Sequence, residues 1–194
     1  MLDPDCLDNR DAGFIARLHR VLSPLLERWF RPDVQGLERI PAGPCLLVGN
    51  HNGAMLMPDM FVLGCALYGR FGLDGLPYGL AHRMGIDLPG VNQLLCRIGG
   101  GRGTAAHGRA LLARGHRVLV YPGGELDSMR AYRDRHRVMF GRRRGYLRLA
   151  IGTGVPLVPF VSSGAHETLF VLNDGRRLAR LLRLDGWPGV RAWP

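Results

Sequence analysis

Apolar residues recur at helical spacing near the start of the chain. Between residues 11 and 30 they alternate with basic residues and tend to one side of a helix: Phe14, Ile15, Leu18, Val21, Leu22, Leu25 and Leu26. This spacing predicts an N-terminal amphipathic helical segment over residues 1–31, with a break near Pro24. Two roles of this helix stay open, and different faces of the helix can serve both. The helix packs on the rest of the domain, or it lies on a membrane surface with Trp29 and Phe30 at the interface.

Shorter apolar runs follow and alternate with helical patterns. The runs interpreted as strands are residues 45–48, 77–81, 118–121 and 155–161. Helices are expected at residues 58–68, 91–96, 104–114 and 144–151. Strands that alternate with helices are typical of an α/β fold with a central sheet flanked by helices. Because no internal repeat, low-complexity tract or linker interrupts the pattern, residues 32–194 are expected to form one domain.

Length and composition agree with this expectation. A chain of 194 residues with 46% hydrophobic residues is sufficient for one domain with a real core. The apolar stretch at residues 55–68 contains Asp59 and is shorter than the roughly 18 residues that a membrane span requires. The acidic start does not resemble a secretory signal, and the 4 cysteines lack metal or redox spacing. We therefore expect a cytosolic protein without a metal site.

The charge is strongly basic, at +10, and all 26 basic residues are arginine. Without lysine, the chain has neither the P-loop lysine nor a lysine for a Schiff base. Arginines gather in one stretch, at positions 130, 133, 135, 137, 142, 143, 144 and 148. Arginine presents a fork of donors that suits phosphate. The stretch is either a solvated basic face or a site for anionic lipid headgroups or substrate phosphate.

Two strand ends carry polar residues with chemical potential. Residues 45–48 are followed by Asn50-His51-Asn52-Gly53, and residues 118–121 by Pro122-Gly123-Gly124-Glu125. Because adjacent parallel strands end at one edge of a sheet, we expect the two segments to share a site. His51 is the candidate general base, and Asp59 is the carboxylate available to orient it. The structural alternatives are a hydrogen-bonded histidine at His51, a helix-start charge at Asp59 and a turn acid at Glu125.

Three segments resemble the glycerolipid and lysophospholipid acyltransferase superfamily, of the 1-acylglycerol-3-phosphate acyltransferase type. They are residues 46–59, 121–130 and 143–160. The common pattern has an aspartate five residues after the histidine, where this chain has Leu56, and Asp59 lies eight residues after His51. Pro122-Gly123-Gly124-Glu125 replaces the usual Pro-Glu-Gly-Thr. These departures resemble a divergent bacterial branch similar to transmembrane-protein-68-like proteins and diacylglycerol acyltransferases. The fold implied is glycerol-3-phosphate acyltransferase-like, with a mixed central sheet.

The resemblance implies acyl transfer from acyl-CoA or acyl-carrier protein to a glycerolipid hydroxyl, with no cofactor. Since an acyl thioester is already activated, a base for the hydroxyl proton and donors for the oxyanion are sufficient. His51 and Asp59 are the expected catalytic residues, and the backbone amides of Gly53 or Gly124 are candidate oxyanion donors. Expected substrate-binding residues are Asn50, Gly53, Gly123, Gly124, Glu125, Arg130 and Arg144. Glu125 and Arg130 are expected at the polar end of the acceptor.

The resemblance also implies partners and a location. Lysophosphatidic acid is the default acceptor, and a mono- or diacylglycerol is the alternative because the Gly-Gly-Glu and Arg-Arg-Gly-Tyr segments resemble the neutral-lipid branch. We expect a peripheral protein on the anionic inner face of the cell membrane. Proteins of this type usually continue beyond the last strand, so the domain is expected to be either truncated or naturally short at Pro194.

Two rival functions compete with acyl transfer. Residues 101–106 fit a Gly-x-Gly-x-x-Ala dinucleotide signature, but the preceding residues 94–98 make a poor strand. A non-enzymatic basic protein would bind nucleic acid or acidic membranes through its arginines, and His51 would then be incidental. We do not expect nucleic acid as a partner.

Overall fold

The computed structural model describes residues 1–53, 57–168 and 170–172. Its central sheet has the strand order β3-β2-β4-β1-β5. The strands are β1 (Leu46–Gly49), β2 (Tyr78–Ala81), β3 (Gly100–Arg102), β4 (Val118–Val120) and β5 (Leu157–Phe160). The expected α/β fold with a flanked central sheet is confirmed. All four pairings among the described strands are parallel, rather than mixed as expected.

Strand β1 lies inside the sheet, between β4 and β5. Leu46 aligns with Val118 of β4 and with Leu157 of β5. All residues of β1 and β4 are buried, which agrees with their continuous apolar sequence because parallel sheets are covered on both faces. The parallel pairing also brings the residues after β1 next to the residues after β4. This edge of the sheet therefore holds both polar segments that the sequence singled out.

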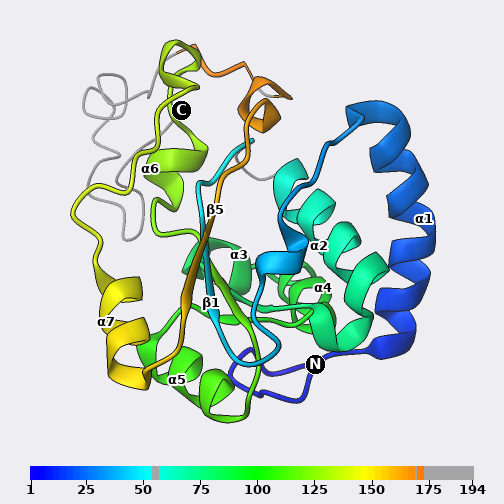
Figure 1. The fold of residues 1–194 in the computed structure, drawn as a ribbon, viewed down its shortest axis with the longest axis vertical. Coiled ribbons are helices and arrows are strands. Elements are labelled where there is room, and N and C mark those ends of the chain that lie inside the picture. Colours follow the sequence, from blue (N-terminus) through cyan, green and yellow to red (C-terminus); the bar gives the residue numbers. More distant parts are fainter. Residues whose placement is uncertain (54–56, 169, 173–194) are drawn as a thin grey trace.

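Helices cover the two faces of the sheet. They are α1 (Ala12–Phe30), α2 (Pro58–Phe71), α3 (Arg83–Ile86), α4 (Val91–Arg97), α5 (Ala105–Ala113), α6 (Glu125–Ser128) and α7 (Gly145–Thr153). Short 3-10 turns occupy Leu37–Arg39, Leu73–Gly75, Tyr132–Asp134 and Ala165–Thr168. In Figure 1, α5 and α7 lie on the opposite side of the sheet from α1 and α2. The expected helices at residues 58–68, 91–96, 104–114 and 144–151 are confirmed with shifted ends.

Two apolar cores follow from the alternation of side chains along β1. Leu46 and Val48 pack with Leu111 of α5 and Leu149 of α7. On the other face, Cys45, Leu47 and Leu119 pack with Met60 and Leu63 of α2 and with Phe160 of β5. Successive strand residues point to opposite faces, so a short run supplies both cores.

Helix α1 runs without interruption through Pro24, so the expected break is absent. Asp11 caps it by accepting a hydrogen bond from the Phe14 N–H at 2.9 Å. Figure 1 shows α1 as the outer layer on its side of the molecule, packed against α2. Ile15 and Leu26 are buried. No helix in the part of the chain described here is long and apolar enough to cross a bilayer.

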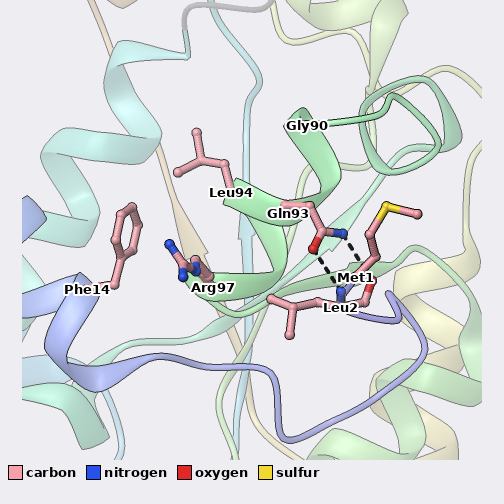
Figure 2. Close-up of a pocket in the computed structure, with 7 residues that line it drawn as sticks. All are labelled: Met1, Leu2, Phe14, Gly90, Gln93, Leu94 and Arg97. Atoms are coloured by element: carbon pink, nitrogen blue, oxygen red, sulfur yellow. Dashed lines mark hydrogen bonds between the residues drawn. The ribbon is translucent and has the colours of Figure 1, made fainter.

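The first ten residues run along the β3 side of the sheet, an arrangement that the sequence did not predict. The Arg102 N–H donates to the carbonyl of Pro4 at 3.2 Å, and the Arg102 guanidinium pairs with Asp5. Gln93 of α4 exchanges two hydrogen bonds with the main chain of Leu2, at 2.8 and 3.1 Å. Figure 2 shows this pairing beside a pocket of about 570 Å³. Its lining residues are Met1, Leu2, Phe14, Gly90, Gln93, Leu94 and Arg97.

Candidate active site

His51 lies two residues beyond the end of β1, at the edge where β4 also ends. Its half-buried ring lies against the ring of Tyr121, with 4.8 Å between the centroids. Burial lowers the pKa of His51 from 6.5 to about 4, and the Asp127 carboxylate offsets only part of this effect. Nδ1 of His51 is buried and has no hydrogen-bond partner among the described residues. The imidazole is therefore neutral near pH 7, the form that a general base requires.

Asp59 is buried at the start of α2, but its hydrogen bonds do not reach His51. One carboxylate oxygen accepts from the Asn52 side-chain amide at 2.9 Å, and the other from the Met60 N–H at 3.0 Å. Burial raises the pKa of Asp59, which the hydrogen bond from Asn52 opposes. In the described part of the chain, Asp59 is thus connected to the histidine segment through Asn52.

Asp127 is the carboxylate that contacts His51, and the sequence reasoning missed it. Its side chain is fully buried, and one oxygen accepts a hydrogen bond from the His51 main-chain N–H at 2.6 Å. The other oxygen accepts from the Met139 N–H at 2.8 Å. The sequence did carry a signal for Asp127, which lies two residues after Glu125 and three before Arg130. A spacing of three residues brings an acid and an arginine close together on one helical turn.

Arg130 is buried beneath the site rather than on its surface. Nη1 donates to the His51 carbonyl at 2.8 Å and pairs with Asp127 at 3.3 Å. Nη2 donates to the Asn52 side-chain oxygen and to the Arg135 carbonyl. Both terminal nitrogens are therefore engaged within the protein, whereas the sequence analysis expected Arg130 to bind the acceptor.

Asn50 and Gly53 shape the turn that carries His51. The Asn50 side chain exchanges two hydrogen bonds with the main chain of Ser162, each at 2.8 Å, and so joins the ends of β1 and β5. Gly53 has a φ of +67°, and a Cβ there would lie 2.8 Å from the Pro58 ring. A larger residue at Gly53 would face both backbone strain and a steric clash.

The segment after β4 forms the opposite side of the site. Gly123 lies so close to Asp127 that an added Cβ would lie 2.2 Å from the Asp127 Cβ. The Gly124 N–H donates to the Tyr121 carbonyl at 3.1 Å, which closes the turn. Asp127 can therefore pack below this turn only because residue 123 has no side chain.

Glu125 is paired with Arg143, and Arg144, the expected substrate-binding residue, is not part of this pair. Arg143 donates a short hydrogen bond to one Glu125 oxygen, while the other oxygen is buried without a partner among the described residues. Burial by itself would raise the pKa of Glu125, but the hydrogen bond and charge of Arg143 lower it below the ordinary value. Arg144 is exposed at the N-cap of α7. The structure thus brings Arg143 to the site and leaves Arg144 on the surface.

A cavity of about 1090 Å³ extends from His51, and its lining includes residues of α1 and α2 on one side of the sheet and of α7 on the other. Most of its lining is apolar, and α1, α2, β2 and the end of β4 each contribute to it. Representative lining residues are Ile15, Leu18, Leu22, Met60, Phe61, Leu63, Gly64, Gly79, Leu80 and Leu119. His51, Tyr121, Glu125 and Arg143 lie in the same lining. A polar group with base character therefore borders a large apolar volume, the usual composition of a site for a small apolar ligand.

The family of the chain follows from comparison with known proteins. A family model described as Acyltransferase matches residues 31–163, more than half of the 194 residues. The chain belongs to this acyltransferase family, as the resemblance in its sequence implied. The matched range includes all five described strands, His51 and the Asp127–Arg130 pair.

Relatives extend the comparison. An uncharacterized protein of Mycobacterium tuberculosis (strain H37Rv) is 31% identical over 179 residues, covering 90% of this chain and 50% of the relative. A Homo sapiens protein named "DGAT1/2-independent enzyme synthesizing storage lipids" is 27% identical over 158 residues, covering 79% of this chain and 46% of the relative. The chain spans about half the length of the curated relatives it matches. No solved structure matches it significantly.

Proposed function

We propose that this chain moves a fatty acyl group from an acyl thioester, acyl-CoA or acyl-carrier protein, to a hydroxyl of a glycerolipid. The observation that carries the proposal is His51 in the lining of a mostly apolar cavity of about 1090 Å³. An acyl chain is an apolar ligand that such a cavity suits, and the histidine provides a base beside it. Membership of the acyltransferase family supports the same reaction class.

In the proposed reaction, neutral His51 takes the proton of the acceptor hydroxyl as that oxygen attacks the thioester carbonyl. A carbon–oxygen bond forms, the carbon–sulfur bond breaks, and the imidazolium returns the proton to the leaving thiolate. No covalent intermediate on the enzyme is needed, since the thioester is already activated. Of the two expected oxyanion donors, the Gly124 N–H is bonded to the Tyr121 carbonyl, and Gly53 is buried outside the described lining of the cavity.

The charges in the cavity lining favour a neutral acceptor over lysophosphatidic acid, the default from sequence. Among the described lining residues, the arginines are Arg102 and Arg143. Arg102 is paired with Asp5 and Asp87, and Arg143 with Glu125. A phosphate would have to compete with these carboxylates for its donors. A mono- or diacylglycerol needs no such cation, and the name of the human relative also favours neutral-lipid synthesis.

An acceptor panel tests this proposal. Purified protein is incubated with radiolabelled acyl-CoA or acyl-carrier protein, and with monoacylglycerol, diacylglycerol or lysophosphatidic acid, before the products are separated by chromatography. We expect labelled ester from an acylglycerol, with less from lysophosphatidic acid. Ester formed only from lysophosphatidic acid would contradict the acceptor assignment, and no ester from any pair by the folded protein would contradict the proposed function.

We further propose that α1 places the cavity beside an anionic membrane. Helix α1 exposes Val21, Leu25 and Trp29, with 65, 58 and 79% of their surfaces accessible. They follow one another at intervals of four residues, so they form one stripe. Exposed arginines on the same helix suit anionic headgroups. The same helix lines the cavity through Ile15, Leu18 and Leu22, so lipid bound at α1 would be near the cavity.

Vesicle binding tests this surface. We expect wild type to float with vesicles that contain anionic lipid and the Trp29→Glu variant to float several-fold less. Ile151→Glu is the matched control, because Ile151 is 81% exposed but belongs to α7 on the other side of the sheet. Equal flotation of the wild type and Trp29→Glu would contradict the assignment of the membrane-binding surface to α1. Reduced flotation of Ile151→Glu alone would assign that surface to α7 instead.

A further inference from the structure

The main chain of His51 is held from both sides by one buried ion pair. Its N–H donates to the Asp127 carboxylate at 2.6 Å, and its carbonyl accepts from Arg130 Nη1 at 2.8 Å. Asp127 and Arg130 also contact each other at 3.3 Å, and their side chains are 0 and 2% exposed. Hydrogen bonds to charged groups are stronger than those between neutral groups. Both polar groups of one residue are thus fixed by charged partners away from water.

The pair is itself fixed by the chain around it. The second oxygen of Asp127 accepts from the Met139 N–H at 2.8 Å, and Arg130 Nη2 donates to the Arg135 carbonyl at 2.8 Å. The ring of buried His166 lies at hydrogen-bond distance, 2.8 Å, from the Arg130 carbonyl. The pair therefore joins the end of β1 to residues 127–139 and to the turn Ala165–Thr168.

Among the described residues, the side chain of His51 has no charged hydrogen-bond partner of the kind that its main chain has. Nδ1 is buried without a hydrogen-bond partner among the described residues, and Asp59 bonds to Asn52 instead. A carboxylate on the far ring nitrogen is the usual means of orienting a catalytic histidine. Here the ring contacts Tyr121, so the position of the ring depends on that contact and on the path of the main chain.

We propose that Asp127 and Arg130 are positioning residues that hold His51 in its reactive place by binding its main-chain N–H and carbonyl. This inference rests on the proposed role of His51 as base. Loss of either partner would let the histidine shift while the cavity lining is preserved. A small misplacement of a catalytic group reduces the rate of the chemical step far more than substrate binding.

The kinetic test uses Asp127→Asn, Arg130→Gln and the double variant, at a temperature where circular dichroism shows all of them folded. We expect kcat to fall about 10- to 100-fold, with KM for the acyl donor within about twofold. Because the two residues act as one unit, the double variant should be little worse than either single variant. Arg117→Gln is the control, since Arg117 also binds main-chain carbonyls, of Gly75 and Pro41, but at the other end of β4. A kcat loss no larger than that of Arg117→Gln would overturn the proposal.

A second measurement requires no variant and no activity. Amide hydrogen exchange of the wild type should show strong protection at His51, although it lies outside regular secondary structure. In Asp127→Asn this protection should fall at least tenfold, with little change in β1 and β4. Exchange at His51 as fast as in an open loop would overturn the proposal. If the wild type transfers no acyl group, the proposed function is wrong. The exchange measurement still tests the contact between Asp127 and His51, because it does not depend on activity.

Discussion

The turn after β1 and the wall formed by α1 and α2 border the same cavity, but they are held in place differently. Around His51, several buried polar side chains are fixed by hydrogen bonds, as Asn50, Asn52, Asp127 and Arg130 show. In the wall, apolar side chains such as Leu18, Leu22 and Leu63 contribute shape without directional bonds. Buried polar contacts tolerate little change, whereas an apolar wall can be reshaped. We therefore expect substitutions at the turn to affect the reaction and substitutions in the wall to affect substrate choice.

The largest effect is expected at the base itself. His51→Ala should lower acyl transfer by about 10²- to 10⁴-fold, because general-base assistance is lost. His136→Ala is the control, since His136 is exposed and does not line the cavity. Initial rates at saturating donor measure the effect. A His51→Ala rate within threefold of the wild type would contradict the role of His51.

A large loss of stability is expected at Asn52. Its amide links Asp59 and Arg130, so Asn52→Leu would leave two buried charged groups each without one partner. Such a loss costs about 3 kcal/mol. Urea unfolding measures it, with Asn9→Leu as control because the Asn9 amide donates to the carbonyls of Asp3 and Cys6 and contacts no buried charged group among the described residues. Equal destabilisation by the two substitutions would show that the buried network does not matter for stability.

The pH dependence is a further consequence of the buried histidine. Because the pKa of His51 is about 4 rather than 6.5, the base form should persist to low pH. We expect kcat/KM to be level above about pH 5 and to fall only as pH drops toward 4. The unfolded chain binds this proton near pH 6.5, so the contribution of His51 to stability is complete above pH 6.5 and declines as pH falls toward 4. A pH–rate profile whose acid limb is centred near 6.5 would contradict the burial of His51.

The smallest effect is expected in the wall. Gly64 of α2 lines the cavity, and a Cβ there would meet nothing within 4 Å. Gly64→Leu should therefore fold and fill part of the cavity, which shifts preference several-fold toward shorter acyl donors. Competition between long and short acyl-CoA measures the shift. Gly152→Leu is the control, because Gly152 has similar open space but does not line the cavity. An unchanged preference in Gly64→Leu would place the acyl chain elsewhere.

The sequence predicted the fold better than the contacts of the site. Strands β1 and β4 have continuous apolar runs, and α1 and α5 have clear helical patterns, so their positions could be read from the chain. Strand β3 was missed because Gly100–Arg102 has neither an apolar run nor an alternating pattern. Its pairing depends on the neighbouring β2, which no local pattern reveals.

Within the site, position could be predicted but partners could not. His51 follows from the strand that precedes it, and the parallel order brings the segment of Glu125 alongside. The choice between Asp59 and Asp127 depends on how two loops fold over each other. The choice between Arg143 and Arg144 depends on the direction in which α7 begins. Both are tertiary outcomes, decided by packing rather than by spacing along the chain.

Binding of an acyl donor that cannot react would test most directly whether the turn serves the reaction and the wall serves substrate binding. A non-transferable thioether analogue of a long-chain acyl-CoA is titrated calorimetrically into the wild type, His51→Ala and Gly64→Leu. We expect His51→Ala to bind it within about twofold of the wild type while having lost acyl transfer, and Gly64→Leu to bind it several-fold more weakly. Weaker binding by His51→Ala with unchanged binding by Gly64→Leu would contradict these separate roles of the turn and the wall.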